Sequence, residues 1–197
     1  FNLDGIFRPT WHPEKNIIAF IGNNGNASDI YIYNLDEDVL KNITNDWFTD
    51  DQVSWDESGE YLFFISNRGD YTETNYYHFY NSNFEQKMIE QTDLYKIKVD
   101  NSVIIRLTDT PFNESYPFYS NTNNMLGYIS DANGINNIYL KPDNSSNEVP
   151  ITNALTGITQ LSWSSATNQL IFTGFNNSGY DIFTMYNPLE KINESIK

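Results

Sequence analysis

The chain has 197 residues, 39% of them hydrophobic and 16% aromatic, which is enough for a folded core and excludes a disordered chain. Its formal net charge of −15 disfavours nucleic acid as a partner, because phosphate backbones would be repelled. Cysteine is absent, which excludes a disulfide framework and a thiolate zinc site, and no apolar run approaches the roughly 20 residues of a membrane span.

Four stretches of similar sequence follow one another along the chain. Each places an aromatic residue at the end of a first predicted strand, at Trp11, Trp55, Tyr119 and Trp163, with spacings of 44, 64 and 44 residues. An apolar run follows, as in IIAFI at 17–21 and YLFFI at 61–65. Short apolar runs between turn clusters are typical of strands, so each stretch predicts two strands joined by a turn.

Two further features recur behind each aromatic residue. An Asp or Asn opens an alternating stretch at Asp29, Asp93, Asn137 and Asp181, and an Ile/Leu-Thr dipeptide follows at 43–44, 107–108 and 151–152. They predict a third and a fourth strand. Both come 20 residues late in the second unit, so 20 residues are inserted there between Ser66 and Asp93. The fourth unit ends in ESIK, a poor match to the fourth strand.

Four short strands per unit of about 44 residues are typical of a β-propeller blade. We therefore predict an all-β chain with about four four-stranded blades visible. The predicted units cover 1–46, 47–110 with an insertion at about 67–92, 111–154 and 155–197, within one propeller region over 1–197. A four-bladed propeller and part of a six- to eight-bladed one both fit. A start at Phe1 without a signal-peptide pattern fits either a removed leader or an excerpt.

The repeat resembles that of the TolB-like, or WD40-like, propellers. The resemblance rests on Pro9-Thr10-Trp11-His12-Pro13 with Ile18-Ala19-Phe20, on Ser54-Trp55-Asp56 with Gly59, and on ISNRGD and ISDANG, which resemble the Ser-Asp-x-Gly turn of that family. It covers the chain apart from the insertion, although the Pro-Asp-Gly turn of the family is degraded in every unit. The resemblance implies the fold of periplasmic TolB, of the tricorn protease and of prolyl-oligopeptidase propellers, and implies little about activity.

The sequence contains no recognisable catalytic arrangement, and we predict neither catalytic residues nor a cofactor. Of the two histidines, His12 occupies a turn position held by Asp56 in the second unit, and His78 lies in the insertion. No Gly-x-Ser-x-Gly or His-Glu-x-x-His motif occurs.

Carboxylates gather at Asp46, Asp50 and Asp51, between the first two units. They are weak candidates for calcium ligands, and a solvated acidic loop is the alternative. The repeated Asx residues 29, 93, 137 and 181 are interpreted as structural, with a side chain that closes the hairpin turn through nearby backbone amides.

Residues 68–70 read Arg-Gly-Asp, a tripeptide known from adhesion ligands. Every unit has a turn here after its second strand, so we interpret Gly69 as a residue that permits a positive φ. The insertion that follows is rich in aromatic residues, a composition suited to recognition: Tyr71, Tyr76, Tyr77, Phe79, Tyr80 and Phe84. The alternative is a hairpin that packs these rings on its own blade.

Two functions fit this sequence. The first is a non-catalytic interaction or scaffold propeller of an envelope, periplasmic or secreted protein, which binds protein partners or further blades and domains of a larger polypeptide. The second is the accessory or gating propeller of a prolyl-oligopeptidase- or tricorn-type peptidase, whose catalytic domain lies outside these residues. A ligand- or glycan-binding propeller is a third possibility.

Overall fold

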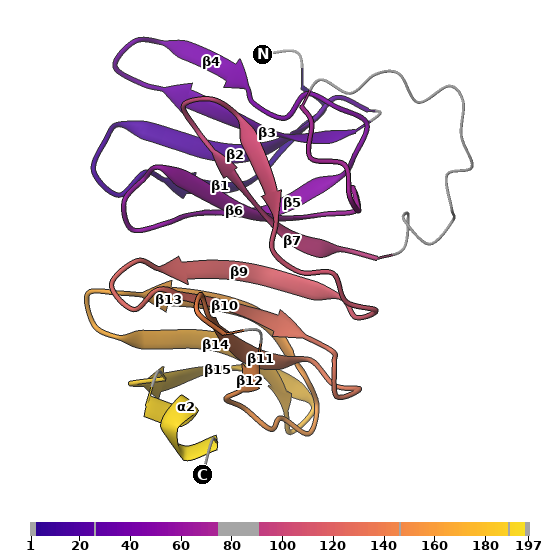
Figure 1. The fold of residues 1–197 in the computed structure, drawn as a ribbon, viewed down its shortest axis with the longest axis vertical. Coiled ribbons are helices and arrows are strands. Elements are labelled where there is room, and N and C mark those ends of the chain that lie inside the picture. Colours follow the sequence, from indigo (N-terminus) through magenta and orange to yellow (C-terminus); the bar gives the residue numbers. More distant parts are fainter. Residues whose placement is uncertain (1–2, 26, 75–90, 146, 189, 196–197) are drawn as a thin grey trace. The chain divides into compact units, whose positions relative to one another are not determined.

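The computed structural model describes residues 3–25, 27–74, 91–145, 147–188 and 190–195. Almost all of the regular structure is β-strand, arranged in four antiparallel sheets (Figure 1). The chain divides into two compact units, Phe1–Pro111 (unit 1) and Phe112–Lys197 (unit 2), with two sheets in each. This division falls at the predicted boundary between the second and third repeats. A single propeller region over all 197 residues stays a prediction.

Unit 1 contains two four-stranded sheets, and the strands of each follow one another in chain order. Sheet 1 consists of β1 (Gly5–Trp11), β2 (Ile17–Asn23), β3 (Ser28–Asn34) and β4 (Val39–Asn42), and sheet 2 of β5 (Asp50–Trp55), β6 (Tyr61–Ser66), β7 (Asp93–Lys98) and β8 (Val103–Arg106). The insertion therefore joins β6 to β7, as predicted.

Unit 2 contains one four-stranded and one three-stranded sheet. Sheet 3 consists of β9 (Glu114–Ser120), β10 (Met125–Ser130), β11 (Asn137–Pro142) and β12 (Val149–Pro150). Sheet 4 consists of β13 (Ile158–Ser164), β14 (Gln169–Asn176) and β15 (Gly179–Tyr186). The prediction of four blade-like units is confirmed, but the last one has three strands among the described residues.

A short helix, α2 (Glu190–Ser195), lies where a weak fourth strand was expected in sheet 4. It begins just after Asn187-Pro188 and contains the helix formers Glu190 and Lys191. The side chain of Ile192 is buried in the core of unit 2. Burial of this apolar residue explains why the segment packs onto the core instead of extending along β15.

The core of each unit is built mainly from the inner strands of its sheets, with single residues of the outer strands. Side chains of β2, β3, β6 and β7 meet in unit 1, and those of β10, β11 and β14 meet in unit 2. Each sheet pairs an aromatic residue of its second strand directly with one of its third. The stacked pairs, with ring centroids 5.6–6.1 Å apart, are Phe20–Tyr31, Phe64–Tyr95, Tyr128–Tyr139 and Phe172–Phe183.

Two of the four repeated aromatic residues, Trp55 and Trp163, contact the preceding sheet of the same unit. The Trp55 indole N–H donates to the Thr10 carbonyl at 3.3 Å, and Trp163 stacks on Phe118 at 5.2 Å. Trp11 belongs to the first sheet and is 61% exposed. Tyr119 donates its hydroxyl to Asp143 at 2.6 Å. These residues thus have a packing role where a sheet precedes them.

Candidate functional site

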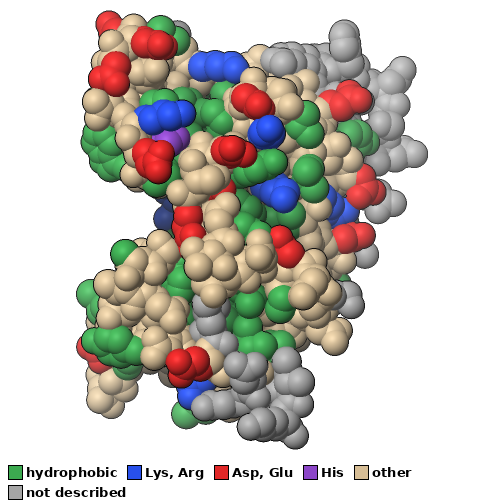
Figure 2. Space-filling view, turned by 60° about the vertical axis from the view of Figure 1, so that its left-hand side comes forward, with side chains coloured by type: hydrophobic (Ala, Val, Ile, Leu, Met, Phe, Trp, Pro, Cys, Tyr) green, Lys and Arg blue, Asp and Glu red, His purple; other side chains and the backbone are tan. Residues whose placement is uncertain are grey.

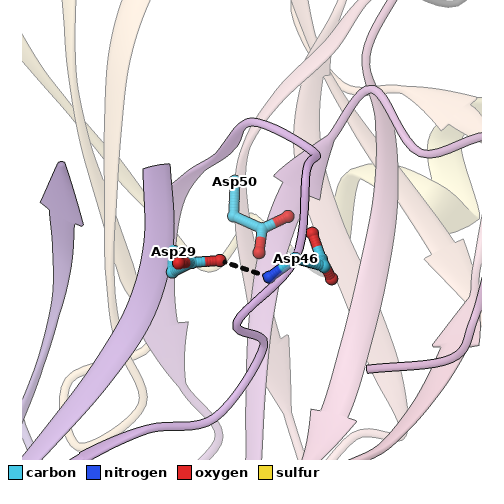
Figure 3. A group of neighbouring side chains, drawn as sticks. All are labelled: Asp29, Asp46 and Asp50. Carbon is cyan, nitrogen blue, oxygen red and sulfur yellow. Dashed lines mark hydrogen bonds between the residues drawn. The ribbon is translucent and has the colours of Figure 1, made fainter. Parts of the chain in front are cut away.

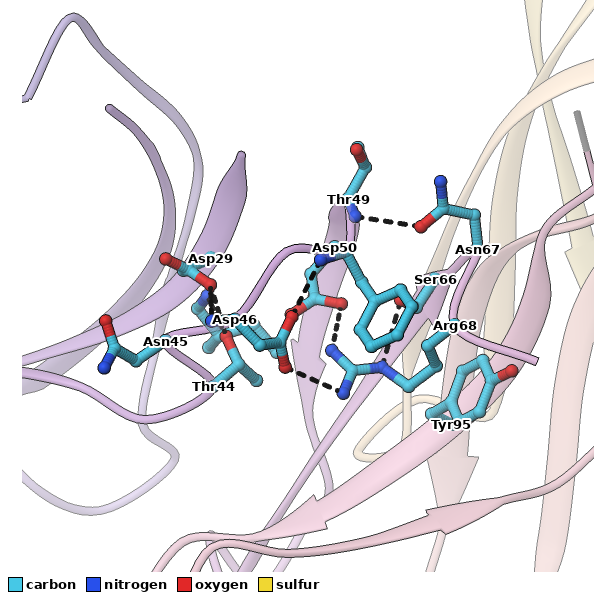
Figure 4. A network of polar contacts seen from close by, with 12 residues as sticks. Asp29, Thr44, Asn45, Asp46, Thr49, Asp50, Ser66, Asn67, Arg68 and Tyr95 are labelled. Carbon is cyan, nitrogen blue, oxygen red and sulfur yellow. Dashed lines mark hydrogen bonds and ion pairs between the residues drawn. The ribbon is translucent and has the colours of Figure 1, made fainter. Parts of the chain in front are cut away.

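A buried ion cluster lies between the two sheets of unit 1. Asp46 precedes β5, Asp50 opens it, and Arg68 follows β6. Arg68 donates from Nη1 to Asp46 Oδ2 at 3.0 Å and from Nη2 to Asp50 Oδ1 at 2.6 Å (Figure 4). All three side chains have 0% exposure. A buried charge is tolerated when it is paired and hydrogen-bonded, so these contacts are needed to keep Arg68 inside the protein.

The rest of the guanidinium is also enclosed. Its Nε donates to Ser66 Oγ at 3.0 Å. Its central carbon lies 5.2–5.8 Å from the ring centroids of Phe48, Phe64 and Tyr95. A planar guanidinium can offer its edge to carboxylates and its faces to rings at once, and a lysine ammonium cannot.

The Arg-Gly-Asp tripeptide is thus part of the fold. Arg68 is inaccessible, and Gly69 has a φ of 55°, the positive value expected for this turn. Asp70 is exposed and accepts from Arg106 Nη1 at 2.6 Å. A receptor that needs both side chains of the tripeptide would find only the aspartate.

Asp29, at the start of β3, extends the cluster with a third carboxylate (Figure 3). Its Oδ1 accepts from the Asp46 amide at 3.0 Å, and its Oδ2 accepts from Asn42 Nδ2 at 2.9 Å. One oxygen from each of Asp29, Asp46 and Asp50 lies within 4.8 Å of the others.

Only two of the three calcium candidates belong to this cluster. Asp51 accepts instead from Arg8 Nε at 2.9 Å in a partly exposed ion pair. The charge that neutralises Asp46 and Asp50 is supplied by Arg68, and a divalent ion would compete with it. Calcium binding by these residues stays a prediction.

The cluster borders a cavity of about 380 Å³ in unit 1. It is lined by Phe7, Arg8, Ile21, Ser28, Thr49, Asp50 and Asp51. The Oδ2 of Asp50 is buried and has no hydrogen-bond partner among the described residues. The lining combines one cation, two carboxylates and two hydroxyls with apolar side chains, but it has no histidine to activate a hydroxyl. This composition suits binding of a polar group more than nucleophilic catalysis.

Arg8 lies at a β-bulge in β1. The pairing of β1 with β2 shifts between Phe7 and Thr10, and Arg8 has a φ of 51°. Gln52 and Tyr116 have φ values of 55° and 52° at the matching positions of sheets 2 and 3. A bulge re-aims a side chain, and here it directs Arg8 towards Asp51. None of these positions is a glycine, so no residue type in the sequence indicates the positive φ.

The pKa of Asp46 is raised to about 7, chiefly by burial; the negative charge of Asp50 also raises this pKa, by more than the charge of Arg68 lowers it. The single guanidinium of Arg68 cannot fully neutralise two adjacent carboxylates, so Asp46 holds its proton more tightly. Burial also raises the pKa of Asp29 and of Asp93.

These shifts predict how stability depends on pH. An aspartate in an unfolded chain has a pKa of about 4, so between about pH 4 and 7 the folded state binds more protons than the unfolded state. The free energy of unfolding is then expected to decrease as the pH rises through this window. Urea denaturation across the window measures it, and Asp46→Asn should reduce the slope. A slope that Asp46→Asn leaves unchanged would contradict the role given to Asp46.

His12 is a buried turn residue. Its Nδ1 accepts from the amides of Glu14 and Lys15 at 3.0 and 3.1 Å, and its ring packs edge-on against Trp55. Burial lowers the pKa of His12. A Cβ on Gly59 would lie 2.3 Å from the His12 ring, which explains the glycine there. No acid or nucleophile is placed against this ring by these contacts.

The repeated Asx residues form hydrogen bonds beyond the hairpin turn as well as within it. Asp29 Oδ1 accepts from the Thr44 hydroxyl at 3.3 Å, and Asn137 Oδ1 accepts from the Thr152 hydroxyl at 2.9 Å. The threonine of the Ile/Leu-Thr dipeptide is thus one partner, and the adjacent hairpin turn supplies others: Asn137 Nδ2 donates to the Ile135 carbonyl at 3.1 Å, and Asp181 accepts from Asn176 Nδ2 at 2.9 Å. The reason is that the fourth strand returns antiparallel beside the third, so that Thr44 and Thr152, which follow the fourth strands, reach the start of the third. We call the contacts of Asp29 with Thr44 and of Asn137 with Thr152 Asx–Thr bridges.

In unit 2, the place that matches the buried ion cluster of unit 1 is a mostly apolar cavity of about 470 Å³. Where unit 1 has Phe48 and Arg68, unit 2 has the smaller Thr156 and Asn176, and both line this cavity. Its wall includes the stacked rings of Phe172 and Phe183. Replacement of the ring and the guanidinium by small polar groups explains why the space is open here.

Of the insertion's aromatic candidates, only Tyr71 lies within the described residues. Its ring stacks on Phe48 at 5.6 Å and is half-buried, as a self-packed loop would have it. Tyr76, Tyr77, Phe79, Tyr80 and Phe84 lie outside the described residues, as does His78. Their role as an interface stays a prediction.

No protein family and no curated protein matches this sequence. Solved structures show that the chain has a β-propeller fold. TolB from Acinetobacter baumannii superposes with a TM-score of 0.72 at 16% identity, over 93% of this chain and 41% of that one. The propeller is therefore of the TolB-like type, and the sequence resemblance is confirmed at the level of the fold.

Two other similar structures come from proteins of different kinds, a protein complex and a peptidase. One is from a nidogen/laminin complex, with a TM-score of 0.64 at 12% identity, over 93% of this chain and 61% of that one. The other is a puromycin-hydrolyzing peptidase of Mycobacterium tuberculosis, with a TM-score of 0.66 at 10% identity, over 94% of this chain and 27% of that one. The chain thus spans less than two thirds of each of these three proteins. In the part of the chain that the structure describes, no helix combines the length and apolarity needed to cross a membrane.

Proposed function

We propose that this chain is a non-catalytic propeller segment that binds other polypeptide through the outer face of sheet 4. One observation carries the proposal. Ile182 of β15 is 75% exposed, whereas the residues at the same repeat position, Ile30, Leu94 and Ile138, are fully buried. The same apolar position is thus covered in three sheets and uncovered in the fourth.

The exposed position belongs to a larger apolar surface. Alternate residues of a strand point to one face, and Tyr180, Ile182 and Tyr186 of β15 are all strongly exposed. We call these three residues the β15 face. On the side of the molecule that Figure 2 shows, unit 1 carries many acidic and basic side chains, and unit 2 shows mostly uncharged atoms. Clusters of exposed aromatic and aliphatic groups are typical of protein interfaces.

The similarity to a structure from a nidogen/laminin complex supports protein binding as a use of this fold. The similarity to TolB supports a periplasmic, cell-envelope or secreted location, which the sequence resemblance implied. The partner is a protein or further blades and domains of a larger polypeptide.

The test is cross-linking with and without a charge on the β15 face. A photoreactive residue at position 180 should cross-link a defined polypeptide in the native source, identified by mass spectrometry. Ile182→Glu should abolish the cross-link because it buries a charge at an apolar contact. Ile105→Glu, at an exposed isoleucine of β8 in unit 1, is the matched control. Equal cross-linking by both variants, or none by the unaltered chain, would refute the proposal.

The second candidate is the accessory propeller of a prolyl-oligopeptidase-type peptidase. The observation in its favour is the superposition of 94% of this chain on 27% of the puromycin-hydrolyzing peptidase. The catalytic residues would then lie elsewhere in the polypeptide. An α/β-hydrolase region with a Gly-x-Ser-x-Gly motif in the same polypeptide would favour this candidate over the first.

A further inference from the structure

The third strand of sheet 4 has an open edge. In sheets 1, 2 and 3, the third strand lies between the second strand and a fourth one. In sheet 4, β15 pairs with β14 on one side, and no described strand pairs with its other side. An open edge presents backbone N–H and C=O groups that a further strand can bind.

The other three sheets show what binds at this edge. The amide N–H of the Ile/Leu in the Ile/Leu-Thr dipeptide donates to the carbonyl of Ile30, Leu94 or Ile138 at 2.8–2.9 Å. The amide N–H of that same third-strand residue donates to the threonine Oγ1 at 2.9–3.0 Å. The threonine hydroxyl completes an Asx–Thr bridge in sheets 1 and 3. In each of sheets 1, 2 and 3, the Ile/Leu-Thr dipeptide therefore forms the same two hydrogen bonds with the same position of the third strand.

Sheet 4 has the same acceptor and donor groups in the same register. Asp181 pairs with Gly174 and Ile182 with Thr173, just as Asp29 pairs with Gly22 and Ile30 with Ile21. Ile182 therefore turns its N–H and C=O outward, as Ile30 does. Asp181 is exposed and accepts from Asn176 Nδ2 at 2.9 Å, and no threonine hydroxyl is bonded to it among the described residues.

Among the described residues that follow β15, none forms a strand on its open edge. The segment Glu190–Ser195 forms α2, which is fixed by burial of Ile192 in the core. Residues 180–184 of β15 are all exposed. The three Ile/Leu-Thr dipeptides that stand at the repeat position, at 43–44, 107–108 and 151–152, are already bound in their own sheets.

We propose that the open edge of β15 binds an extended peptide segment carrying an Ile/Leu-Thr dipeptide, supplied from outside these 197 residues. The inference rests on the proposed function, because it names the chemistry of the bound polypeptide. The segment adds as an antiparallel fourth strand. Its Ile/Leu amide donates to the Ile182 carbonyl, and its threonine accepts from the Ile182 amide and donates to Asp181.

The segment at 103–110, VIIRLTDT, is our probe because it binds β7 beside Asp93, the residue that matches Asp181 of β15. Its Arg106 contacts the Asp93 carboxylate at 2.8 Å, and Asp93 matches Asp181 in the repeat. A bound peptide would place its arginine at Asp181. The arginine and the threonine hydroxyl of the peptide would then both contact the Asp181 carboxylate, so we expect Asp181 to contribute most to binding.

Fluorescence anisotropy with a dye-labelled VIIRLTDT peptide tests the proposal on the full chain. We expect saturable binding with one peptide per chain. Replacement of the peptide threonine by valine and the Asp181→Ala variant should each weaken binding at least about tenfold, since hydrogen bonds to charged groups are worth about 1.5–3 kcal/mol. Asp100→Ala removes the charge of an exposed aspartate in unit 1, outside sheet 4, and should leave binding unchanged.

Hydrogen exchange measured by NMR locates the bound peptide. The outward amides of Ile182 and Thr184 should be protected on binding, while that of Phe183, which faces β14, should not change. No saturable binding, equal binding of the valine peptide, or protection away from β15 would overturn the proposal. So would a concentration-dependent dimer that excess peptide dissociates, because that result assigns the edge to a second copy. A partner that cross-links at position 180 without any peptide binding would overturn this inference and leave the proposed function standing.

Discussion

Replacing Arg68 with methionine is expected to lower the free energy of unfolding of unit 1 by about 3–5 kcal/mol. The substitution leaves Asp46 and Asp50 without the cation that both of them contact. Their side chains are fully buried, so water cannot replace the lost ion pairs. Urea denaturation followed by tryptophan fluorescence measures the effect, because Trp55 packs against the core of unit 1.

A matched control for Arg68→Met is Arg8→Met. Arg8 also pairs with an aspartate, at 2.9 Å, but its side chain is 40% exposed. Exposed pairs contribute about 0–1 kcal/mol, so this variant should be nearly as stable as the original chain. Adding Asp46→Asn to Arg68→Met should recover part of the loss by removing one unpaired charge. Equal stabilities of Arg68→Met and Arg8→Met would show that the buried cluster does not stabilise the fold.

Replacing Phe64 with alanine should cost about 3–5 kcal/mol of unfolding free energy. Phe64 is fully buried, stacks on Tyr95 and contacts the Arg68 guanidinium. Its removal leaves a cavity and takes away one ring from the enclosure of the buried charge. The expected loss is measured by the same denaturation experiment.

Phe172→Ala tests whether this cost depends on the neighbours. Phe172 has the same repeat position in sheet 4 and stacks on Phe183 at the same 5.7 Å. It is only partly buried and lines the cavity of unit 2. Its replacement should therefore cost less than that of Phe64, by about 1–2 kcal/mol. Equal costs would contradict the difference in packing between the two units.

The Arg68 cluster explains why the arginine of the Arg-Gly-Asp tripeptide is buried. A turn position after the second strand correctly required Gly69, since turn geometry is a local property of the chain. The burial of Arg68 depends on Asp46 and Asp50, which are 22 and 18 residues away. Neither charge nor spacing in the sequence distinguishes such a cluster from an acidic loop, so the sequence alone does not separate Asp51 from the two buried aspartates.

The repeat alone determined the number of sheet units, the ends of most strands and the site of the insertion, because strand alternation and turn chemistry are encoded within a few residues. It also identified the Asx and Ile/Leu-Thr positions. Tertiary structure decided that they bond to each other across 15 residues, that Trp11 and Ile182 are exposed while their counterparts are covered, and that α2 replaces a fourth strand. These outcomes depend on which sheet or strand lies alongside, and a single unit of the repeat carries no information about its neighbours.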